Sequence, residues 1–462
     1  MTRRDDDARG GEVRFLSLCG MLGYGYPQAS LARGLAARPA FIGVDAGSTD
    51  PGPYYLGSGR SFVSAMQVER DLEPALCAAR RLGIPLVVGS AGGSGARPHL
   101  ERTVDLVRAL AARNGLHFRL ATIAADLELE TLLQALREGR MAPCGPAGEL
   151  TAERVRACTH LVGQMGTGPL VRALDGGADV VLAGRCCDTA IFAALPILRG
   201  CDPALALHLA KIAECGALCA RPAAANDALV GILRHDHFVV EPANPARRCT
   251  PESVAMHSLY EQPDPTCFHE PEGTVDLSAC TFEPCGERGV RVAGTRLVPP
   301  ERPTIKVEGA ALRGYRAVAV AGVRDPAVIA HLDAIEHAVR ASVADALAPA
   351  AEPAEYSLRF LRYGLDGVLG HLEPAATAPP TEVGLVLEAV AATQELADTA
   401  LALARSTALH QHFPGRKTTA GNLAFPFSPS DLCGGPVYEF AVYHLMAVAE
   451  PDALFPVTFQ EV

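Results

Sequence analysis

An alternation of short apolar segments with helical segments runs through the first half of the chain, and it constrains the fold more than any other feature. Apolar, strand-like segments lie at 14–18, 40–45, 84–88, 117–123, 159–163 and 179–183. Helical periodicity is seen between or after them, at 28–37, 62–82, 98–114 and 127–138. Strands that are apolar throughout and alternate with helices are typical of a parallel sheet with helices on both faces. We therefore predict an α/β domain over residues 13–226, preceded by a disordered lead-in over residues 1–12.

The pattern changes after about residue 227. Polar, proline-rich segments continue to residue 303, so residues 227–314 are expected to form a mixed polar/β insertion or connecting region. Strands are then predicted at 315–322, 356–362 and 383–391, and helices at 326–346 and 393–410. This βαββα order predicts a C-terminal α+β domain over residues 315–462.

The composition excludes several classes of partner. The net charge of the 462 residues is −11, and there is no Trp, which together make nucleic acid a poor partner. No apolar stretch follows the charged amino terminus, and none reaches the length that spans a membrane, so we expect a cytoplasmic protein without a membrane partner. The 14 Cys residues include no CxxC pair, which favours reduced, mostly buried thiols. We also expect a homo-oligomer.

Glycine-rich loops follow several of the predicted strands, where parallel α/β proteins bind ligands. The first loop, AGSTDPGPYYLGSG, follows the segment 40–45. Its oxygen-bearing side chains, beside backbone that glycine leaves open, predict a ligand site, although a long turn held by its own Asx hydrogen bonds is the alternative. The predicted binding residues are Asp45, Ser48, Thr49 and Tyr54, with Asp50 as a catalytic acid or base.

The second loop, GSAGGSGARP, leads from the segment 84–88 into a helix. Its backbone N–H groups could form an anion-binding nest, which predicts a site for a carboxylate, a phosphate or the phosphates of coenzyme A. The predicted residues are Ser90, Gly92, Gly93, Ser94 and Arg97. The loop lacks the spacing of a P-loop or a dinucleotide fingerprint, which argues against ATP and NAD. A crossover without a ligand is the alternative.

The third and fourth loops are GQMGTGP and GRCCDT, which follow 159–163 and 179–183. Gln164, Thr167, Arg185 and Thr189 are predicted to bind substrate, and Asp188 to act as an acid or base. Cys187 is a candidate nucleophile, because a thiol at a helix amino terminus beside Arg can have a lowered pKa. Helix capping and inert packing explain the same residues without catalysis.

Two further groups lie outside these loops. His410, Arg416, Lys417 and Asn422 follow a long predicted helix and could close over an anionic ligand, or could simply be a solvated helix C-terminus. Lys306, in the apolar segment TIKVEGA, is a second candidate base or enolate stabiliser.

Several longer segments carry a resemblance to a known family. They include GVDAGSTDPGPYYLGSG, GADVVLAGRCCDTAIFAA, ESVAMHSLYEQPDP, TIKVEGA and FPGRKTTAGNLAFPFSPSDL, in this order along the chain. The chain resembles the acyclic terpene utilisation (AtuA) family from about residue 15 to its end. The resemblance implies a pathway of small carboxylates or acyl-CoA thioesters, and it allows for a small, separately encoded partner subunit. Relatives usually carry a small or polar residue where this chain has Cys186 and Cys187, which shifts weight to Arg185, Asp188 and Thr189.

We expect a lyase of the hydratase or dehydratase type that acts on a small carboxylate or its acyl-CoA thioester. Asp188 or Asp50 would move the proton, a step that suits a carboxyl whose pKa is raised by burial. Acyl transfer or thioester hydrolysis is the first alternative, and a non-catalytic accessory subunit is the second. No cofactor is expected. The alternative to a site without a cofactor is a divalent metal ion bound by Asp45, Asp50 and Asp188.

Overall fold

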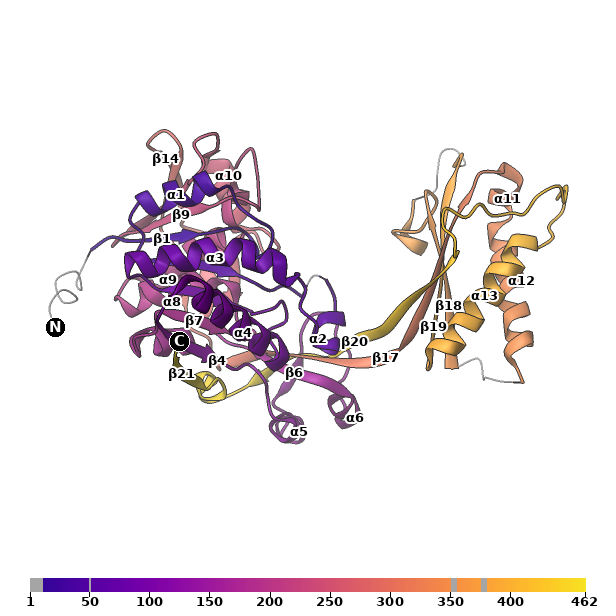
Figure 1. Ribbon diagram of the computed structural model, residues 1–462, viewed down its shortest axis with the longest axis horizontal. Helices are drawn as coiled ribbons and strands as arrows, with labels where there is room; N and C mark the ends of the chain where they lie inside the picture. Colours follow the sequence, from indigo (N-terminus) through magenta and orange to yellow (C-terminus); the bar gives the residue numbers. More distant parts are fainter. Residues whose placement is uncertain (1–10, 50, 350–354, 375–379) are drawn as a thin grey trace. The chain divides into compact units, whose positions relative to one another are not determined.

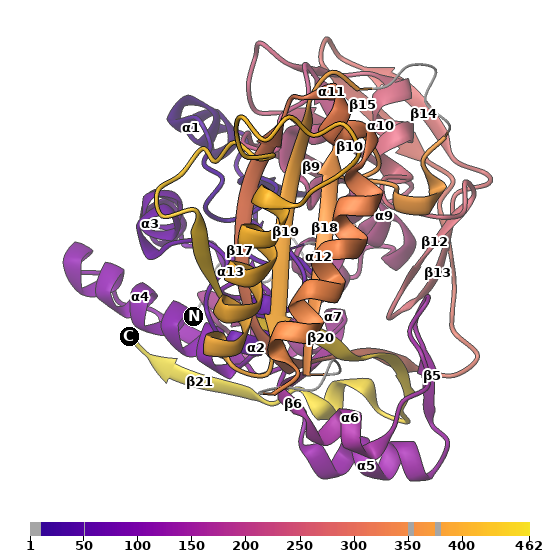
Figure 2. The same ribbon diagram turned by 90° about the vertical axis from the view of Figure 1, so that its right-hand side faces the viewer.

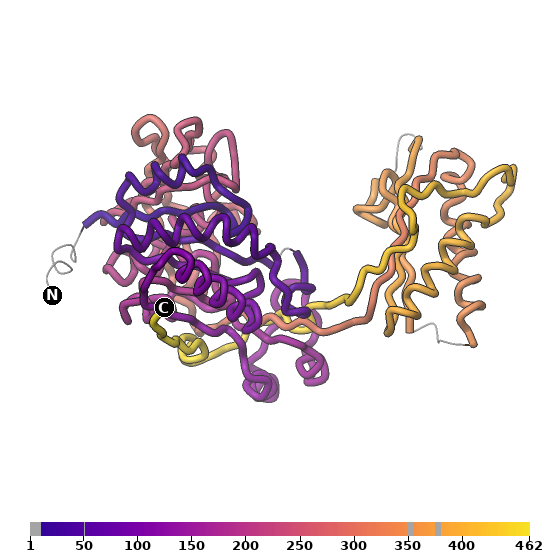
Figure 3. The backbone as a smooth tube through the Cα atoms, in the orientation of Figure 1, coloured from indigo at the N-terminus to yellow at the C-terminus, as the bar shows by residue number. Residues whose placement is uncertain are grey.

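The chain folds into two compact units in the computed structural model, which describes residues 11–49, 51–349, 355–374 and 380–462. Unit 1 contains the described residues up to Ala311 together with Phe440–Val462, and unit 2 contains Leu312–Glu439. The chain passes from unit 1 to unit 2 through the long strand β17 (Thr304–Val323) and returns through β20 (Asp431–Ala447) (Figure 3).

Unit 1 is built on a mixed sheet whose centre is parallel. In spatial order its strands are β14 (Thr281–Cys285), β15 (Gly289–Ala293), β10 (His237–Pro242), β9 (Leu229–Leu233), β1 (Val13–Ser17), β2 (Phe41–Asp45), β3 (Leu86–Gly89), β7 (Val180–Ala183), β4 (Arg119–Ile123) and β21 (Val457–Glu461). Strands β1, β2, β3, β7 and β4 are parallel neighbours, whereas β9 and β21 add antiparallel strands at either side.

Helices cover both faces of this sheet, as the sequence predicts (Figure 1). Helices α1 (Gln28–Ala36), α3 (Ala65–Leu82) and α4 (Arg97–Asn114) share one core on one face, and α8 (Asp188–Leu198), with its neighbours α7 (Thr167–Asp175) and α9 (Pro203–Ala213), packs on the other. Consecutive residues of β1 show why its segment is apolar throughout. Leu16 belongs to the core beneath the first group of helices, whereas the ring of Phe15 lies 5.4 Å from that of Phe192 in α8. Both sides of the strand are therefore buried.

The order of the central strands differs from their order in the chain. Strand β7 lies between β3 and β4, so the carboxyl ends of β2, β3 and β7 are side by side. The apolar segment at 159–163 forms a strand, β6 (Cys158–Gln164), but it pairs antiparallel with β17 and not within the parallel sheet. A strand pattern gives no information on which neighbour it pairs with.

Shorter elements complete unit 1. They are α2 (Tyr54–Ser58), α5 (Leu129–Arg137), β5 (Met141–Pro143), α6 (Ala152–Arg156), β8 (Ala220–Arg221), β11 (Arg248–Cys249), α10 (Pro251–Ser258), β12 (Cys267–Glu270), β13 (Gly273–Asp276), β16 (Arg296–Val298) and the 3₁₀ turns Gly216–Cys219 and Pro451–Leu454. The polar region 227–314 thus supplies four strands of the main sheet and the hairpin β12–β13, which pairs with β16.

Unit 2 is the expected α+β layer. Strands β18 (Tyr356–Tyr363) and β19 (Val383–Ala391) pair beside β17, and β20 continues the sheet. Helices α12 (Leu332–Leu347) and α13 (Gln394–His410) cover one face of it, preceded by the short α11 (Pro326–Ala330), and a 3₁₀ turn spans Gly370–Leu372 (Figure 2). Alternate residues of β19, among them Leu385 and Leu387, form the core under these helices.

Residues 440–462 belong to unit 1, although the sequence analysis grouped them with the C-terminal domain. The reason is the pairing of β21 with β4, which no local pattern reveals. None of the described helices combines the length and apolar character needed to cross a bilayer.

Candidate acid–base site

Three of the predicted loops meet at the carboxyl ends of β2, β3 and β7. The N–H of Ser90 donates to Gly184 O (3.1 Å), and the N–H of Arg185 donates to Gly95 O (3.2 Å). Gly95 has φ +66°, and a Cβ there would overlap the backbone of Arg185. Only glycine allows both this conformation and this approach. Gly95 therefore serves the contact between the second and fourth loops.

The loop before α7 joins the same group. The N–H of Cys187 donates to Met165 O (2.8 Å), and the N–H of Met165 donates to Arg185 O (3.1 Å). Backbone hydrogen bonds therefore join the second, third and fourth loops, and the N–H of Ala46, at the start of the first loop, donates to Gly89 O (3.0 Å).

A buried ion triad lies beneath the fourth loop. The guanidinium of Arg185 donates to both carboxylate oxygens of Glu308 (3.0 and 3.3 Å), and the Nζ of Lys306 lies 2.9 Å from Glu308 Oε1. Burial alone would raise the pKa of Glu308, but the two cations outweigh it and hold the pKa below its ordinary value. Because Arg185 is only 4% exposed and already paired with Glu308, its positive charge is balanced by a carboxylate of the protein itself.

Lys306 has a second contact besides its ion pair with Glu308. Its Nζ donates to the hydroxyl of Tyr443 (3.2 Å) and its side chain is 19% exposed. Burial lowers its pKa, but the charge and the hydrogen bond of Glu308, together with Tyr443, raise it above its ordinary value, so Lys306 is a cation at neutral pH. It is suited to stabilising negative charge rather than to accepting a proton.

A pocket of about 190 Å³ opens beside these groups, lined by the exposed Glu261 and by three carboxyl side chains that are less exposed. They are Asp45 at the end of β2, Asp188 at the start of α8 and Glu214 just after α9. The rest of the lining includes Gly20, Met21, Tyr24, Gly47, Ser48, Pro51, Phe62, Cys215, Leu218, Ala225, Tyr260 and Glu261. We call this the acid pocket.

The two aspartates of the acid pocket resist ionisation. Burial raises the pKa of Asp45 well above its usual range, and the neighbouring carboxylate of Asp188 raises it further. Burial also raises the pKa of Asp188, although Arg185, Lys211 and Lys306 oppose this shift. The Oδ1 atom of Asp188 is buried and has no hydrogen-bond partner among the described residues. Two such carboxyl groups in one pocket can hold a single proton between them.

Glu214 forms an ion pair with Lys211, one turn earlier in the sequence (2.5 Å). Burial raises the pKa of Glu214 to about 8 despite the opposing effect of Lys211. A carboxyl of this kind can carry a proton near neutral pH.

A second carboxylate, Glu270 at the end of β12, lies at the amino terminus of α8. Its Oε2 accepts hydrogen bonds from Cys187 Sγ (2.7 Å) and from Thr189 Oγ1 (2.7 Å). Burial raises the pKa of Glu270 to about 7, and burial with the nearby Glu270 raises the pKa of the Cys187 thiol well above its usual range. Cys187 is therefore a thiol donor in this state, not a thiolate.

The same hairpin contacts the preceding helix. Glu272 Oε1 accepts from the N–H (2.6 Å) and the hydroxyl (2.7 Å) of Thr167, at the start of α7. Both hydrogen-bond donors of Thr167 are therefore bonded to a carboxylate of the protein. Gln164, the last residue of β6, lies opposite Lys306 of β17.

Sequence reasoning missed Lys211, Glu214, Glu270, Glu272 and Glu308. Two signals were available: Lys211 interrupts an otherwise apolar helical stretch, and Glu308 alternates with Lys306 in an apolar strand. Charged residues in apolar segments are seldom buried without a partner. Glu270 and Glu272 carry no such signal, because their segment is polar.

The other predicted residues of the first loop lie in different local environments. Ser48 lines the acid pocket, while the carbonyl of Thr49 accepts from the N–H of Gly52 in a turn (2.9 Å). Tyr54 begins α2, with its ring edge-on to Tyr55. Asp50 lies outside the described residues.

In the second loop, Ser90 is buried and its hydroxyl accepts from the N–H of Cys186 (3.3 Å). Gly92 and Gly93 have positive φ and Ser94 is buried. The side chain of Arg97 is exposed, and its N–H donates to Asp126 Oδ1 (3.1 Å).

The basic segment after α13 belongs to unit 2. His410 ends the helix and Lys417 is exposed. Asn422 is buried and donates to the carbonyls of Ala408 and Gln411 (both 2.9 Å), while Arg416 Nε donates to Asn422 Oδ1 (2.9 Å). Asn422 and Arg416 therefore hold their own loop together, and a role of this segment over a ligand stays a prediction.

No set of three or more His, Cys, Asp or Glu side chains in the described part of the chain is arranged to hold a metal ion. The cations near the acid pocket, Arg185 and Lys211, form ion pairs with carboxylates of the protein. Among the described residues of the glycine-rich loops, Arg97 is the positively charged residue that is exposed.

The fold and the site together define a doubly wound α/β protein with a buried acid–base pocket at the carboxyl edge of its parallel strands. The chain belongs to the acyclic terpene utilisation (AtuA) family, whose model matches residues 64–428. Comparisons with curated proteins and with solved structures give no match.

Proposed function

We propose that this protein is an enzyme that adds or removes water at a small carboxylate or its acyl-CoA thioester. The observation that carries the proposal is the pairing of Asp45 and Asp188 in the acid pocket, where Asp188 Oδ1 is buried without a partner among the described residues. Their raised pKa values suit an acid and a base that work near neutral pH.

The surrounding charges support a division of roles between the two aspartates. Arg185, Lys211 and Lys306 all favour the ionised form of Asp188, whereas its own negative charge favours the protonated form of Asp45. In the dehydration direction, Asp188 takes the proton from the carbon next to the carbonyl group. The C–O bond then breaks, and the proton of Asp45 passes to the leaving hydroxide, which departs as water. The charge of Lys306 stabilises the enolate that forms between these steps.

The size of the acid pocket sets what can enter it. At about 190 Å³ it is smaller than the roughly 300–1,000 Å³ of pockets that enclose drug-sized ligands. It therefore suits the reacting part of a small acid. The coenzyme of a thioester would remain outside, where the exposed Arg97 could meet a phosphate.

The test is a panel of hydroxy acids, unsaturated acids and their CoA thioesters, with incorporation of ¹⁸O from labelled water as the readout. Asp188→Asn and Asp45→Asn should each lower the rate by about 10²–10⁴-fold, the usual contribution of general acid–base catalysis. Asp105→Asn, an exposed acid on α4, is the matched control and should leave the rate unchanged. Equal rates in all the variants would contradict the proposal.

Acyl transfer or thioester hydrolysis is a second candidate, favoured by the contact between Cys187 and Glu270 (2.7 Å). Glu270 is placed to take the thiol proton, after which sulfur would attack the thioester carbonyl and CoA would leave as its thiol. Cys187→Ala separates the two candidates, because it would abolish acyl transfer while leaving the Asp45–Asp188 pair in place. A non-catalytic accessory subunit would show ligand binding with no turnover in any of these assays.

A further inference from the structure

We propose that the acid pocket admits the acyl part of its substrate as an uncharged thioester and disfavours the free carboxylate, and this inference rests on the proposed function of that pocket. It narrows the substrate class from two to one. Two observations carry it: the charges of the side chains that line the pocket, and the pairing of the cations that lie near it.

The lining of the acid pocket is rich in acids. Asp45, Asp188, Glu214 and the exposed Glu261 all contribute carboxyl groups to it. No Lys, Arg or His is found among the described residues of the lining. A carboxylate ligand would therefore leave water without meeting a cation in the wall of the pocket, and burying a charge without a partner is costly.

The cations near the pocket are bound to carboxylates of the protein. Arg185 is paired with Glu308 (3.0 Å), and Lys211 is paired with Glu214 (2.5 Å). The Nζ of Lys306 also lies 2.9 Å from Glu308. A carboxylate from solution would have to compete with Glu308 or Glu214 for these cations, whereas an uncharged acyl group needs no such partner.

The proposed reaction itself favours an uncharged acyl group. Asp188 removes a proton from the carbon next to the carbonyl group, and the electron pair of that C–H bond moves toward the carbonyl oxygen. From a thioester this step gives an enolate with one negative charge, whereas from a carboxylate it gives two negative charges on one small group. Repulsion between like charges is stronger in a buried site than in water. A thioester avoids the second charge.

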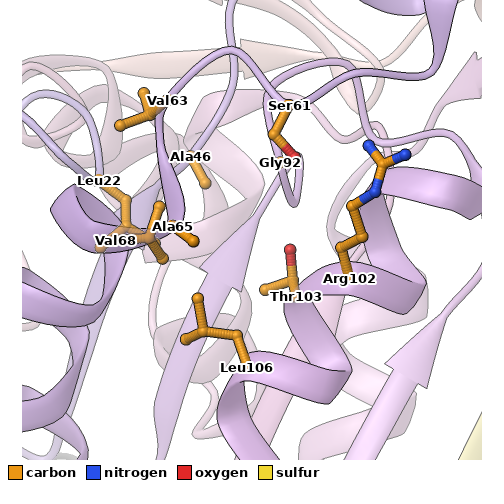
Figure 4. Close-up of a pocket in the computed structure, with 10 residues that line it drawn as sticks. All are labelled: Leu22, Ala46, Ser61, Val63, Ala65, Val68, Gly92, Arg102, Thr103 and Leu106. Carbon is orange, nitrogen blue, oxygen red and sulfur yellow. The ribbon is translucent and has the colours of Figure 1, made fainter.

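A second pocket, between α3 and α4, could also accept an uncharged molecule. Leu22, Val68 and Leu106 are part of its lining (Figure 4). It measures about 90 Å³, and the described residues that line it include none of those that line the acid pocket. Val68→Phe places a ring in this space, so binding that survives the substitution takes place elsewhere.

The test compares butyrate with S-methyl thiobutyrate, which have the same acyl chain and differ in charge, by NMR titration of the full chain. The thioester should bind the unmodified protein at least about tenfold more tightly than the carboxylate, because it leaves water without a charge. Val68→Phe should leave this ratio of affinities unchanged.

Two substitutions should reduce the ratio by raising the affinity for butyrate. Glu214→Ala leaves Lys211 beside an open space that the carboxylate of butyrate can fill, for a gain of about tenfold. Glu261→Lys adds a cation at the exposed position of the lining, for a gain of up to about fivefold. Glu101→Lys, which makes the same change of charge at an exposed position of α4 outside the lining, is the matched control and should leave the ratio unchanged.

Equal binding of the two probes by the unmodified protein would overturn the inference, and so would a ratio that neither Glu214→Ala nor Glu261→Lys reduces. A preference for the thioester without hydration or dehydration of any CoA thioester would instead count against the proposed function alone. Turnover of free hydroxy acids as fast as that of their CoA thioesters would support the proposed function and contradict the inference.

Discussion

At the scale of single residues, the buried charges around α8 are arranged unevenly. Arg185 and Lys306 share Glu308, and Lys211 pairs with Glu214. The two aspartates of the acid pocket have no ion-pair partner of this kind in the part of the chain that the structure describes. The excess positive charge of the Arg185–Glu308–Lys306 triad favours one ionised aspartate, and burial opposes a second.

The triad should be costly to break. Glu308 is 1% exposed, so Glu308→Gln would leave the buried Arg185 and the partly buried Lys306 without their common partner. We expect a loss of about 3–5 kcal/mol in the free energy of unfolding, measured by urea denaturation. Glu283→Gln, which removes a partner of Arg291 from a side chain that is 60% exposed, should cost less than about 1 kcal/mol. Equal losses in the two variants would contradict a structural role for the triad.

Glu270 predicts a specific pH dependence. Its pKa is about 7 in the fold against 4.5 for the ordinary group, so the folded chain holds a proton that the unfolded chain releases. Below about pH 4.5 Glu270 is protonated in both the folded and the unfolded chain, so it does not lower the free energy of unfolding. As the pH rises from 4.5 to 7, its contribution to stability falls, by up to about 3 kcal/mol, and above pH 7 the loss is complete.

Glu270→Gln removes this titration. The free energy of unfolding of the unmodified protein should therefore fall relative to the variant between pH 4.5 and 7, and the difference should be constant above pH 7. Urea denaturation at several pH values measures it. A difference that does not change with pH would show that Glu270 is ionised in the fold.

At the scale of elements, the loops that end β3 and β7 act as one unit. Gly95→Ala places a methyl group against the backbone of Arg185, at φ +66°. Gly83→Ala is a matched control, because Gly83 has φ +64° and open space around its Cβ position. The control should cost about 1–2 kcal/mol for the left-handed conformation alone.

Gly95→Ala should cost clearly more than the control, and it should also weaken binding of small carboxylates, because the loop carrying Asp188 must move. Thermal unfolding and NMR titration measure the two effects. Equal stability of the two variants would mean that the loops do not depend on this contact.

Most elements are readable from local patterns. The helices α1, α4 and α13 and the strands β2 and β19 lie within a few residues of their predicted bounds, because periodicity and glycine-rich ends mark them. The partners of the strands are not local information. The position of β7 between β3 and β4, and the departure of β6 to β17, depend on packing between distant segments.

The residues of the candidate site likewise divide into those that local sequence patterns predict and those that depend on packing between distant segments. Asp45, Arg185 and Asp188 follow predicted strands, so their convergence at one edge could be inferred. The other residues that set their charge come from α9 and β17, at sequence distances that no motif spans. Arg185, predicted to bind substrate, is instead paired with Glu308.

At the scale of the whole molecule, the end of the chain supports the first unit. Strand β21 pairs with β4, and the guanidinium of Arg119 lies 4.5 Å from the centre of the Phe459 ring. Removing residues 457–462 would leave β4 as an open edge. We expect a Tm lower by several degrees, recorded by calorimetry, together with weaker carboxylate binding.

A matched substitution checks that prediction. Phe459→Ala keeps the strand but removes the ring, and it should lower the Tm by less than the deletion does. An unchanged Tm after deletion would mean that β21 adds nothing to unit 1.

The central claim of this account is that Asp45 and Asp188 share one proton at neutral pH. Infrared titration of the carboxyl groups tests it directly, with Asp45→Asn and Asp188→Asn to assign the bands. Several protonated carboxyl bands should persist to about pH 7 in the unmodified protein, and one of them should be lost in Asp45→Asn while those of Glu214 and Glu270 remain. Complete ionisation of both aspartates near pH 4 would contradict it.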